Sequence, residues 1–103
     1  MSAVELEGRL ICESVEEMGV VLRHLPRHIE LTLWEPGCLR FEVEQSDDGL
    51  VWIVSEKFES QAAFGRHQAR VATGEWGRAT AGIQRDYVIS AGDQRRRKRP
   101  ARS

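Results

Sequence analysis

Alternating hydrophobic and polar positions open the chain and predict a half-buried strand over residues 4–13. Side chains alternate across a strand, so one side of this segment is apolar and the other is charged. The apolar side carries Val4, Leu6, Leu10 and Cys12. Gly8 falls in the same row and leaves a gap, which is either a bulge or a place where another group approaches closely.

The spacing of hydrophobic residues then changes to a helical period. Ser14 and Glu17 form a capping box, so a helix is expected to begin directly after the strand. Pro26 should kink or split this helix, and Pro36-Gly37 should end it. The residues expected to form its core stripe are Val15, Met18, Leu22, Leu25 and Ile29.

The rest of the pattern predicts three more strands and a second helix. Strands are expected over residues 38–45, 50–58 and 83–89, with a hairpin turn at Ser46–Gly49 and a helix from Ser60 to about Thr73. The element order is β-α-β-β-α-β. It predicts an α+β, ferredoxin-like fold with both helices on one face of a four-stranded antiparallel sheet.

The distribution of charge divides the chain into one domain and a C-terminal tail. The formal net charge of −1 divides into −6 for residues 1–91 and +5 for residues 92–103. Residues 1–91 are expected to form the folded domain, and residues 92–103 lack periodicity and are predicted to be a disordered basic tail. No aromatic residue interrupts the basic run 95–99. A solvated terminus therefore explains it better than specific nucleic-acid recognition.

The sequence gives no sign of a membrane or secretory protein. No apolar run approaches the roughly 20 residues of a membrane span, and no signal-peptide pattern precedes Val4. Two cysteines, Cys12 and Cys38, do not make a disulfide framework. We therefore expect a cytoplasmic protein with no membrane partner.

The stretch from Trp52 to His67 is the most promising place for a functional site. Glu56 lies on the apolar side of a predicted strand, between Trp52 and Phe58. His67 follows Phe64 by three residues, so both share the helix face that should cover that strand. The pattern thus brings a carboxylate and an imidazole together in an apolar setting.

A second pair of histidines, His24 and His28, has the i, i+4 spacing of a metal-binding pair. Pro26 lies between them, and no third ligand is evident. We predict an exposed helix face there and no metal site.

The sheet face opposite the helices is expected to carry apolar side chains among its charges. These are Ile11, Val51, Ile53 and Val88. Exposed apolar patches usually mark interfaces, so we expect a two-fold homodimer formed through this face.

Several segments resemble the antibiotic biosynthesis monooxygenase domain family. They are residues 35–43 (EPGCLRFEV), 52–58 (WIVSEKF) and 62–64 (AAF), followed by His67, and the likeness extends over residues 3–90. The resemblance implies a dimeric α+β barrel with a cavity between sheet and helices in each subunit. It also implies oxidation of a small electron-rich phenol or quinol by O2 without flavin or metal. The sequence is compatible with this, because it contains no G-x-G-x-x-G, no Walker loop and no paired C-x-x-C.

On this resemblance, His67, Arg85 and Glu56 are the candidate catalytic residues. His67 is the natural base, since its ordinary pKa of about 6.5 allows proton exchange at neutral pH. Arg85 is placed to hold a phenolate. The residues expected to line a small aromatic ligand are Trp52, Phe64, Trp76 and Phe41.

Structural roles remain open for each of these residues. His67 either acts in chemistry or fixes helix to strand through Glu56 or a carbonyl. Glu56 and Arg85 either serve the reaction or form a buried ion pair. The aromatic residues either line a ligand or fill the core.

One departure from the family pattern bears on activity. Several oxygenating members of the family use a buried asparagine near the substrate or oxygen, and this chain has none. Gln45, Gln68 and Gln84 are the candidates for its replacement. The alternative to an oxygenase is therefore a non-catalytic member that binds a small ligand or serves as a dimeric interaction module.

Overall fold

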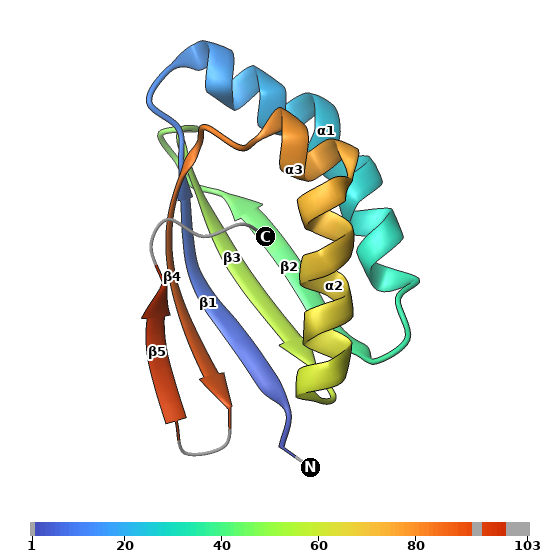
Figure 1. Ribbon diagram of the computed structural model, residues 1–103. Helices are drawn as coiled ribbons and strands as arrows, with labels where there is room; N and C mark the ends of the chain where they lie inside the picture. Colours follow the sequence, from blue (N-terminus) through green and yellow to red (C-terminus); the bar gives the residue numbers. More distant parts are fainter. Residues whose placement is uncertain (1, 92–93, 99–103) are drawn as a thin grey trace.

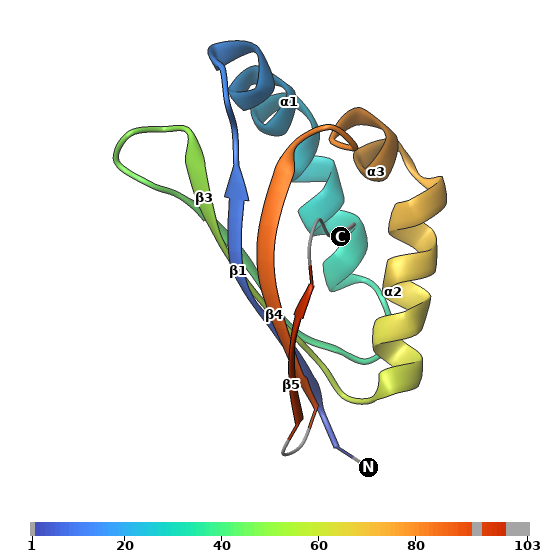
Figure 2. The same cartoon turned by 60° about the vertical axis from the view of Figure 1, so that its left-hand side comes forward.

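A computed structural model describes residues 2–91 and 94–98 of the chain. Its elements are β1 (Val4–Ile11), α1 (Val15–Leu33), β2 (Cys38–Gln45), β3 (Val51–Phe58), α2 (Gln61–Thr73), α3 (Glu75–Ala79), β4 (Gln84–Ala91) and β5 (Gln94–Lys98). The strands form one antiparallel sheet in the order β2-β3-β1-β4-β5. The helices cover one face of the sheet, as Figures 1 and 2 show. The predicted β-α-β-β-α-β arrangement and its four antiparallel strands are confirmed, with α3 and β5 added.

Helix α1 begins as predicted but turns a different stripe inward. The Ser14 hydroxyl accepts a hydrogen bond from the Glu17 backbone N–H, and the helix continues through Pro26 without splitting. Two residues of the expected stripe, Val15 and Leu22, are exposed. The buried residues are Val21, Leu25, His28 and Thr32. Because His28 and Thr32 are polar, hydrophobicity alone favoured the neighbouring stripe.

A bulge at the start of β2 alters the predicted alternation there. Cys38 pairs with Phe58 and Arg40 pairs with Lys57, so Leu39 is an extra residue in the ladder. Leu39 is consequently exposed, whereas Phe41 further along the strand is buried as expected.

Gly8 brings β1 close to β4. It lies opposite Tyr87 in the ladder, and a Cβ atom at this position would lie only 2.8 Å from the Tyr87 Cα. The Tyr87 side chain, 2% exposed, occupies the gap that Gly8 leaves in the apolar row. Of the two predicted explanations for Gly8, close approach of another group is the one that holds.

The predicted disordered tail contains a strand. Residues 94–98 pair antiparallel with β4, from Ala91 opposite Gln94 to Tyr87 opposite Lys98. The prediction of a disordered tail included no strand here. The open edge of β4 offers backbone hydrogen bonds whatever side chains the added strand carries. Residues 92, 93 and 99–103 of the predicted tail lie outside the described residues.

Candidate functional site

Two buried histidines face each other between the helices and the sheet. His67 comes from α2 and is fully buried, and His28 comes from α1 and is 2% exposed. Their ring centroids are 5.9 Å apart. The sequence indicated His67 as a site residue, but the prediction that His28 lies on an exposed helix face is wrong. His28 follows Val21 by seven residues, two helical turns, and so shares its buried face.

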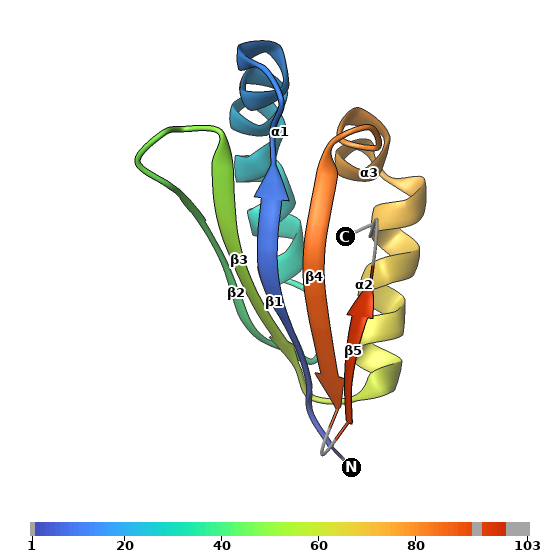
Figure 3. The ribbon, with the colours of Figure 1, turned by 90° about the vertical axis from the view of Figure 1, so that its left-hand side faces the viewer.

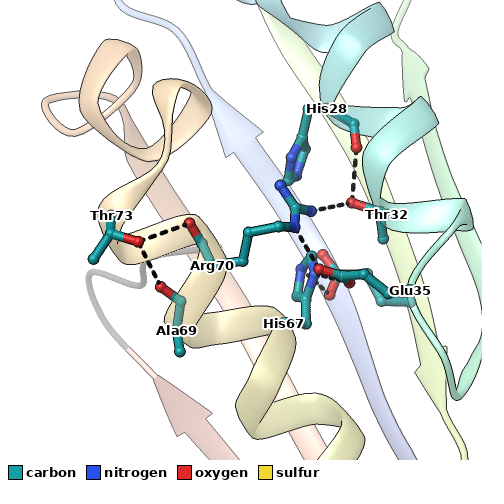
Figure 4. A network of polar contacts seen from close by, with 8 residues as sticks. His28, Thr32, Glu35, His67, Ala69, Arg70 and Thr73 are labelled. Carbon is teal, nitrogen blue, oxygen red and sulfur yellow. Dashed lines mark hydrogen bonds and ion pairs between the residues drawn. The ribbon is translucent and has the colours of Figure 1, made fainter.

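A polar network holds His67 in place (Figure 4). Its Nδ1 lies 2.8 Å from Oε1 of Glu35, in the turn after α1. The Arg70 guanidinium donates through Nε to the other oxygen of Glu35 and through Nη2 to the Thr32 hydroxyl at 2.8 Å. Thr32 in turn donates to the His28 carbonyl at 2.8 Å. The network therefore joins α1, the α1–β2 turn and α2 around the two imidazoles.

Sequence reasoning missed Glu35 and Arg70 as site residues. Arg70 follows His67 by three residues and is therefore its neighbour on the surface of α2. Glu35 is separated from His67 by two strands and a turn, so no local spacing connects the two. Its position directly before Pro36-Gly37 was the one signal that could have identified it, because this turn returns the chain to the sheet beneath α2.

Burial keeps both imidazoles neutral. Desolvation lowers the pKa of His67 below its ordinary value, and the nearby Glu35 carboxylate opposes that shift without reversing it. Desolvation, aided by the positive charges of Arg70 and Arg85, lowers the pKa of His28 to about 2. The Glu35 carboxylate, also bound by Arg70, is an acceptor, so we assign the His67 proton to Nδ1. Nε2 of His67 then presents a lone pair.

That second nitrogen of His67 makes no hydrogen bond within the described part of the chain. The nearest oxygen of Glu56, which is 1% exposed, lies 3.7 Å from it, too far for a hydrogen bond. Both ring nitrogens of His28 likewise find no partner among the described residues. Buried polar atoms are nearly always paired, so three nitrogens without a partner in one small volume make it the candidate functional site.

Aromatic side chains surround the two imidazoles. Trp76 stacks on His28 with ring centroids 4.6 Å apart and planes 4° from parallel, and Phe41 meets the same ring edge-on at 5.2 Å. Phe58, which sequence reasoning did not select, lies 4.9 Å from the His67 ring. Phe64 packs behind Phe58 at 5.7 Å. Of the four predicted lining residues, the structure places Phe41 and Trp76 against the histidines.

Trp52 and Arg85 serve other parts of the interior. Trp52 is a buried member of the core. Arg85 is 3% exposed, and its guanidinium donates to the Thr80 carbonyl at 2.7 Å, the Ile83 carbonyl at 2.9 Å and the Thr80 hydroxyl at 2.7 Å. These three bonds tie the loop after α3 to β4. Holding a phenolate, the role expected for Arg85, stays a prediction.

Among the three candidate glutamines, Gln68 is the one directed into the protein. Its amide nitrogen is buried and has no hydrogen-bond partner among the described residues. Gln45 and Gln84 are exposed.

A pocket of about 110 Å³ opens between α1, α3 and the end of α2. Its walls are formed by His24, Arg27, His28, Leu31, Arg70, Gly74, Glu75 and Trp76. His28 and Arg70 connect this pocket to the network around His67. His67 itself does not line the pocket. Within residues 2–91 and 94–98, no three His, Cys, Asp or Glu side chains are grouped to hold a metal ion. No helix in the same part of the chain is long and apolar enough to cross a membrane.

The chain belongs to the antibiotic biosynthesis monooxygenase family. The sequence model of that family matches residues 16–79, more than half of the chain, and this confirms the resemblance carried by the Glu-Pro-Gly turn and the His67 helix. Comparison with curated protein sequences gave no significant match.

Solved structures share the fold at low sequence identity. A conserved protein from Methanosarcina mazei is 17% identical with a TM-score of 0.73, covering 87% of this chain and 92% of its own. Rv0793 from Mycobacterium tuberculosis is 18% identical with a TM-score of 0.70, covering 86% and 93%. A variant of SnoaB from Streptomyces nogalater, a cofactor-independent oxygenase, is 16% identical with a TM-score of 0.68, covering 89% and 94%. At these identities the comparison establishes the fold and leaves the reaction to be argued from the site.

Proposed function

We propose that the protein is a cofactor-independent monooxygenase that oxidises a small electron-rich phenol or hydroquinone with O2. The observation that supports the proposal is the environment of His67. Its imidazole is buried and neutral, its Nδ1 contacts the Glu35 carboxylate, and its Nε2 has no hydrogen-bond partner among the described residues. A base oriented by a second group in this way is the usual arrangement for abstracting a proton from a hydroxyl. Membership of the family and the fold shared with SnoaB support the same chemistry.

The reaction needs a proton acceptor and a dry site. Nε2 of His67 takes the proton of a substrate hydroxyl, and Glu35 stabilises the imidazolium that forms. The phenolate passes one electron to O2, and the resulting radical and superoxide combine to form a carbon–oxygen bond. The peroxide then takes the proton from His67. Its O–O bond breaks with loss of the ring C–H proton, which releases water and leaves a carbonyl. For hydroquinone the sum is hydroquinone plus O2 giving hydroxyquinone plus water.

The surroundings of His67 suit the early steps. Phe41 and Phe58 lie beside its ring and exclude water, which favours transfer of the proton to a fixed group rather than to solvent. The pocket between α1 and α3 ends at His28 and does not include His67. On this proposal the substrate enters there and passes the His28 ring to reach Nε2 of His67. His28 is a neutral hydrogen-bonding group at this position, because its low pKa makes it a very weak base.

Oxygen consumption tests the proposal. Wild type and His67→Ala are supplied with a panel of hydroquinones and phenols, with flavin excluded and metals chelated. At least one compound should be oxidised by the wild type, and His67→Ala should reduce that rate by roughly 10²–10⁴-fold. Arg66→Ala, an exposed neighbour on α2, is the control and should keep the wild-type rate. An active wild type matched by His67→Ala would exclude this role for His67.

A second candidate function is ligand binding without reaction. The specific observation in its favour is that the pocket is lined by His28 and Trp76 and stops short of His67. On this proposal His67 and Glu35 are a structural bridge between α2 and the α1–β2 turn. His67→Ala would then cost roughly 1–3 kcal/mol of unfolding free energy, with no oxidation to lose.

We also propose a homodimer formed through the sheet face opposite the helices, which Figure 3 shows from the front. Ile11 pairs with Val51 across β1 and β3, and Ile53 on the same face is 46% exposed. A patch of this kind supports association with a second copy.

A cytoplasmic location is proposed from the cysteines. Cys12 and Cys38 are both free thiols, and burial raises the pKa of each above its ordinary value. Protonated, partly shielded thiols of this kind fit a reducing compartment.

A further inference from the structure

The pocket between α1 and α3 has a chemical character that the oxygenase proposal does not use. Two arginines, Arg27 and Arg70, line it, against one carboxylate, that of Glu75. Glu75 is engaged by His24, whose Nδ1 lies 3.1 Å from its Oε2 across the pocket. Arg70 makes its bonds to Glu35 and Thr32 through Nε and Nη2, so these bonds do not use its Nη1 group. Arg27 donates through Nη1 to Glu30 at 2.7 Å, a bond that does not use its Nε and Nη2 groups. Both arginines thus already pair with a carboxylate of the protein, and what they offer a ligand is their remaining guanidinium N–H donors.

The inner wall is apolar except for one buried polar group. Leu31 and Trp76 supply flat and aliphatic surface. Between them lies His28, which is 2% exposed and has both ring nitrogens without a hydrogen-bond partner among the described residues. A ligand that brings a polar substituent to this ring would satisfy a group that the fold leaves unpaired.

From these features we infer that the pocket binds a small aromatic carboxylate of a single ring. Its carboxylate meets Arg27 and Arg70, and its ring lies against Trp76 and Leu31, with any ring hydroxyl directed to His28. A volume of about 110 Å³ is well below the roughly 300–1,000 Å³ of pockets for drug-sized ligands, which limits the occupant to one ring. Planar arginine groups are well suited to binding carboxylates.

This inference concerns binding and holds whether or not the protein is an oxygenase. If the oxygenase proposal is correct, the pocket is where a substrate first binds, because its walls do not include His67. If His67 proves to have no catalytic role, the same pocket remains a binding site. A binding measurement therefore tests it separately from oxygen consumption.

Titration with benzoate and with benzyl alcohol, followed by NMR, is the experiment. The two probes share a ring and differ in charge. Benzoate should shift the ring signals of His28 and Trp76 and bind at least about tenfold more tightly than benzyl alcohol, because charge-assisted hydrogen bonds to arginine are roughly twice as strong as neutral ones. Its affinity should also fall as salt is added.

Two matched variants test whether the Arg27 guanidinium binds the carboxylate of benzoate. Arg27→Ala should weaken benzoate binding about three- to fivefold, as expected for loss of a partly exposed charge pair, and should leave benzyl alcohol unaffected. Arg23→Ala removes the same charge one turn earlier on α1, from an exposed residue outside the pocket, and should change neither affinity. Thermal unfolding of both variants confirms that the fold is kept. Equal affinity for the two probes, equal effects of the two variants, or shifts confined to other residues would each overturn the inference.

Discussion

Polar side chains on the two faces of the sheet differ in their burial and in their hydrogen bonding. On the helix side, His67 and Glu56 are almost completely buried, and Nε2 of His67 has no hydrogen-bond partner within the described residues. On the outer side, Arg40 donates to Glu5 at 3.1 Å, to Glu7 at 3.0 Å and to Ser55 at 2.9 Å, and none of these partners is buried. The buried pair thus includes a nitrogen without a hydrogen-bond partner, whereas the exposed Arg40 has three partners.

We interpret the inner face as the one that carries the candidate site and the outer face as an ordinary exposed surface. Leaving a polar atom unpaired in the interior lowers the free energy of unfolding by about 1–3 kcal/mol. An arrangement with this cost is expected where it serves a function. Exposed ion pairs contribute little to stability, so the outer network should add little to the free energy of unfolding. We therefore expect substitutions on the inner face to have large effects. On the outer face, the apolar Ile53 should matter more than the charges around it.

Gly8→Val should have the largest effect. The added side chain would meet the Tyr87 backbone and ring and force β1 away from β4. Overpacking of this severity should cost about 3 kcal/mol of unfolding free energy, measured by urea denaturation. Arg9→Ala, the next residue on the same strand but on the outer face, is the control and should cost less than about 1 kcal/mol. Similar losses for both variants would remove the distinction between the faces.

Ile53→Asp should have the second largest effect, because it places a charge in the proposed dimer interface. Burying an unpaired carboxylate should weaken association by about 2 kcal/mol, seen by sedimentation as a shift from dimer to monomer. Leu22→Asp on α1 is the matched control, since Leu22 is 49% exposed and Ile53 is 46% exposed. A wild type that sediments as a monomer at micromolar concentration would contradict the proposed dimer.

Acid should destabilise the protein through the inner face. The pKa of His28 falls to about 2 and that of His67 is also lowered, while in the unfolded chain both return to 6.5. Below pH 6.5 the unfolded state therefore binds more protons than the folded state, and stability decreases as the pH falls. Each histidine should contribute up to about 1.4 kcal/mol per pH unit.

Urea denaturation at pH 7, 6 and 5 measures this decrease. The His28→Gln variant removes one of the two buried groups and should show a shallower slope than the wild type. An unchanged slope would show that His28 is not kept neutral by the fold.

The smallest effect is expected at Arg40. Arg40→Ala removes three hydrogen bonds on the outer face, but its partners remain hydrated. We expect a loss of no more than about 1 kcal/mol, which falls further in 1 M salt. A loss above 3 kcal/mol would show that the outer network is a structural element comparable to the inner one.

The order of elements and the position of the second helix could be predicted from the amino-acid sequence. Ser60 caps α2 through the Ala63 backbone N–H, and the strand over residues 51–58 buries alternate side chains as its pattern predicts. These features follow from local rules, namely the period of two in strands, capping hydroxyls and Pro-Gly turns. They also placed His67 and Glu56 on facing surfaces, so half of the candidate site could be predicted.

The remaining features depend on contacts between distant parts of the chain. His28 faces inward because α1 rotates to bury Val21 instead of Leu22, a choice made by the shape of the sheet beneath it. Glu35 reaches His67 because the α1–β2 turn folds back alongside α2, and Leu39 is displaced by a bulge in the pairing of β2 with β3. β5 forms because the edge of β4 is open. Each of these contacts joins residues far apart in the chain, and hydrophobic spacing carries no information about such pairings.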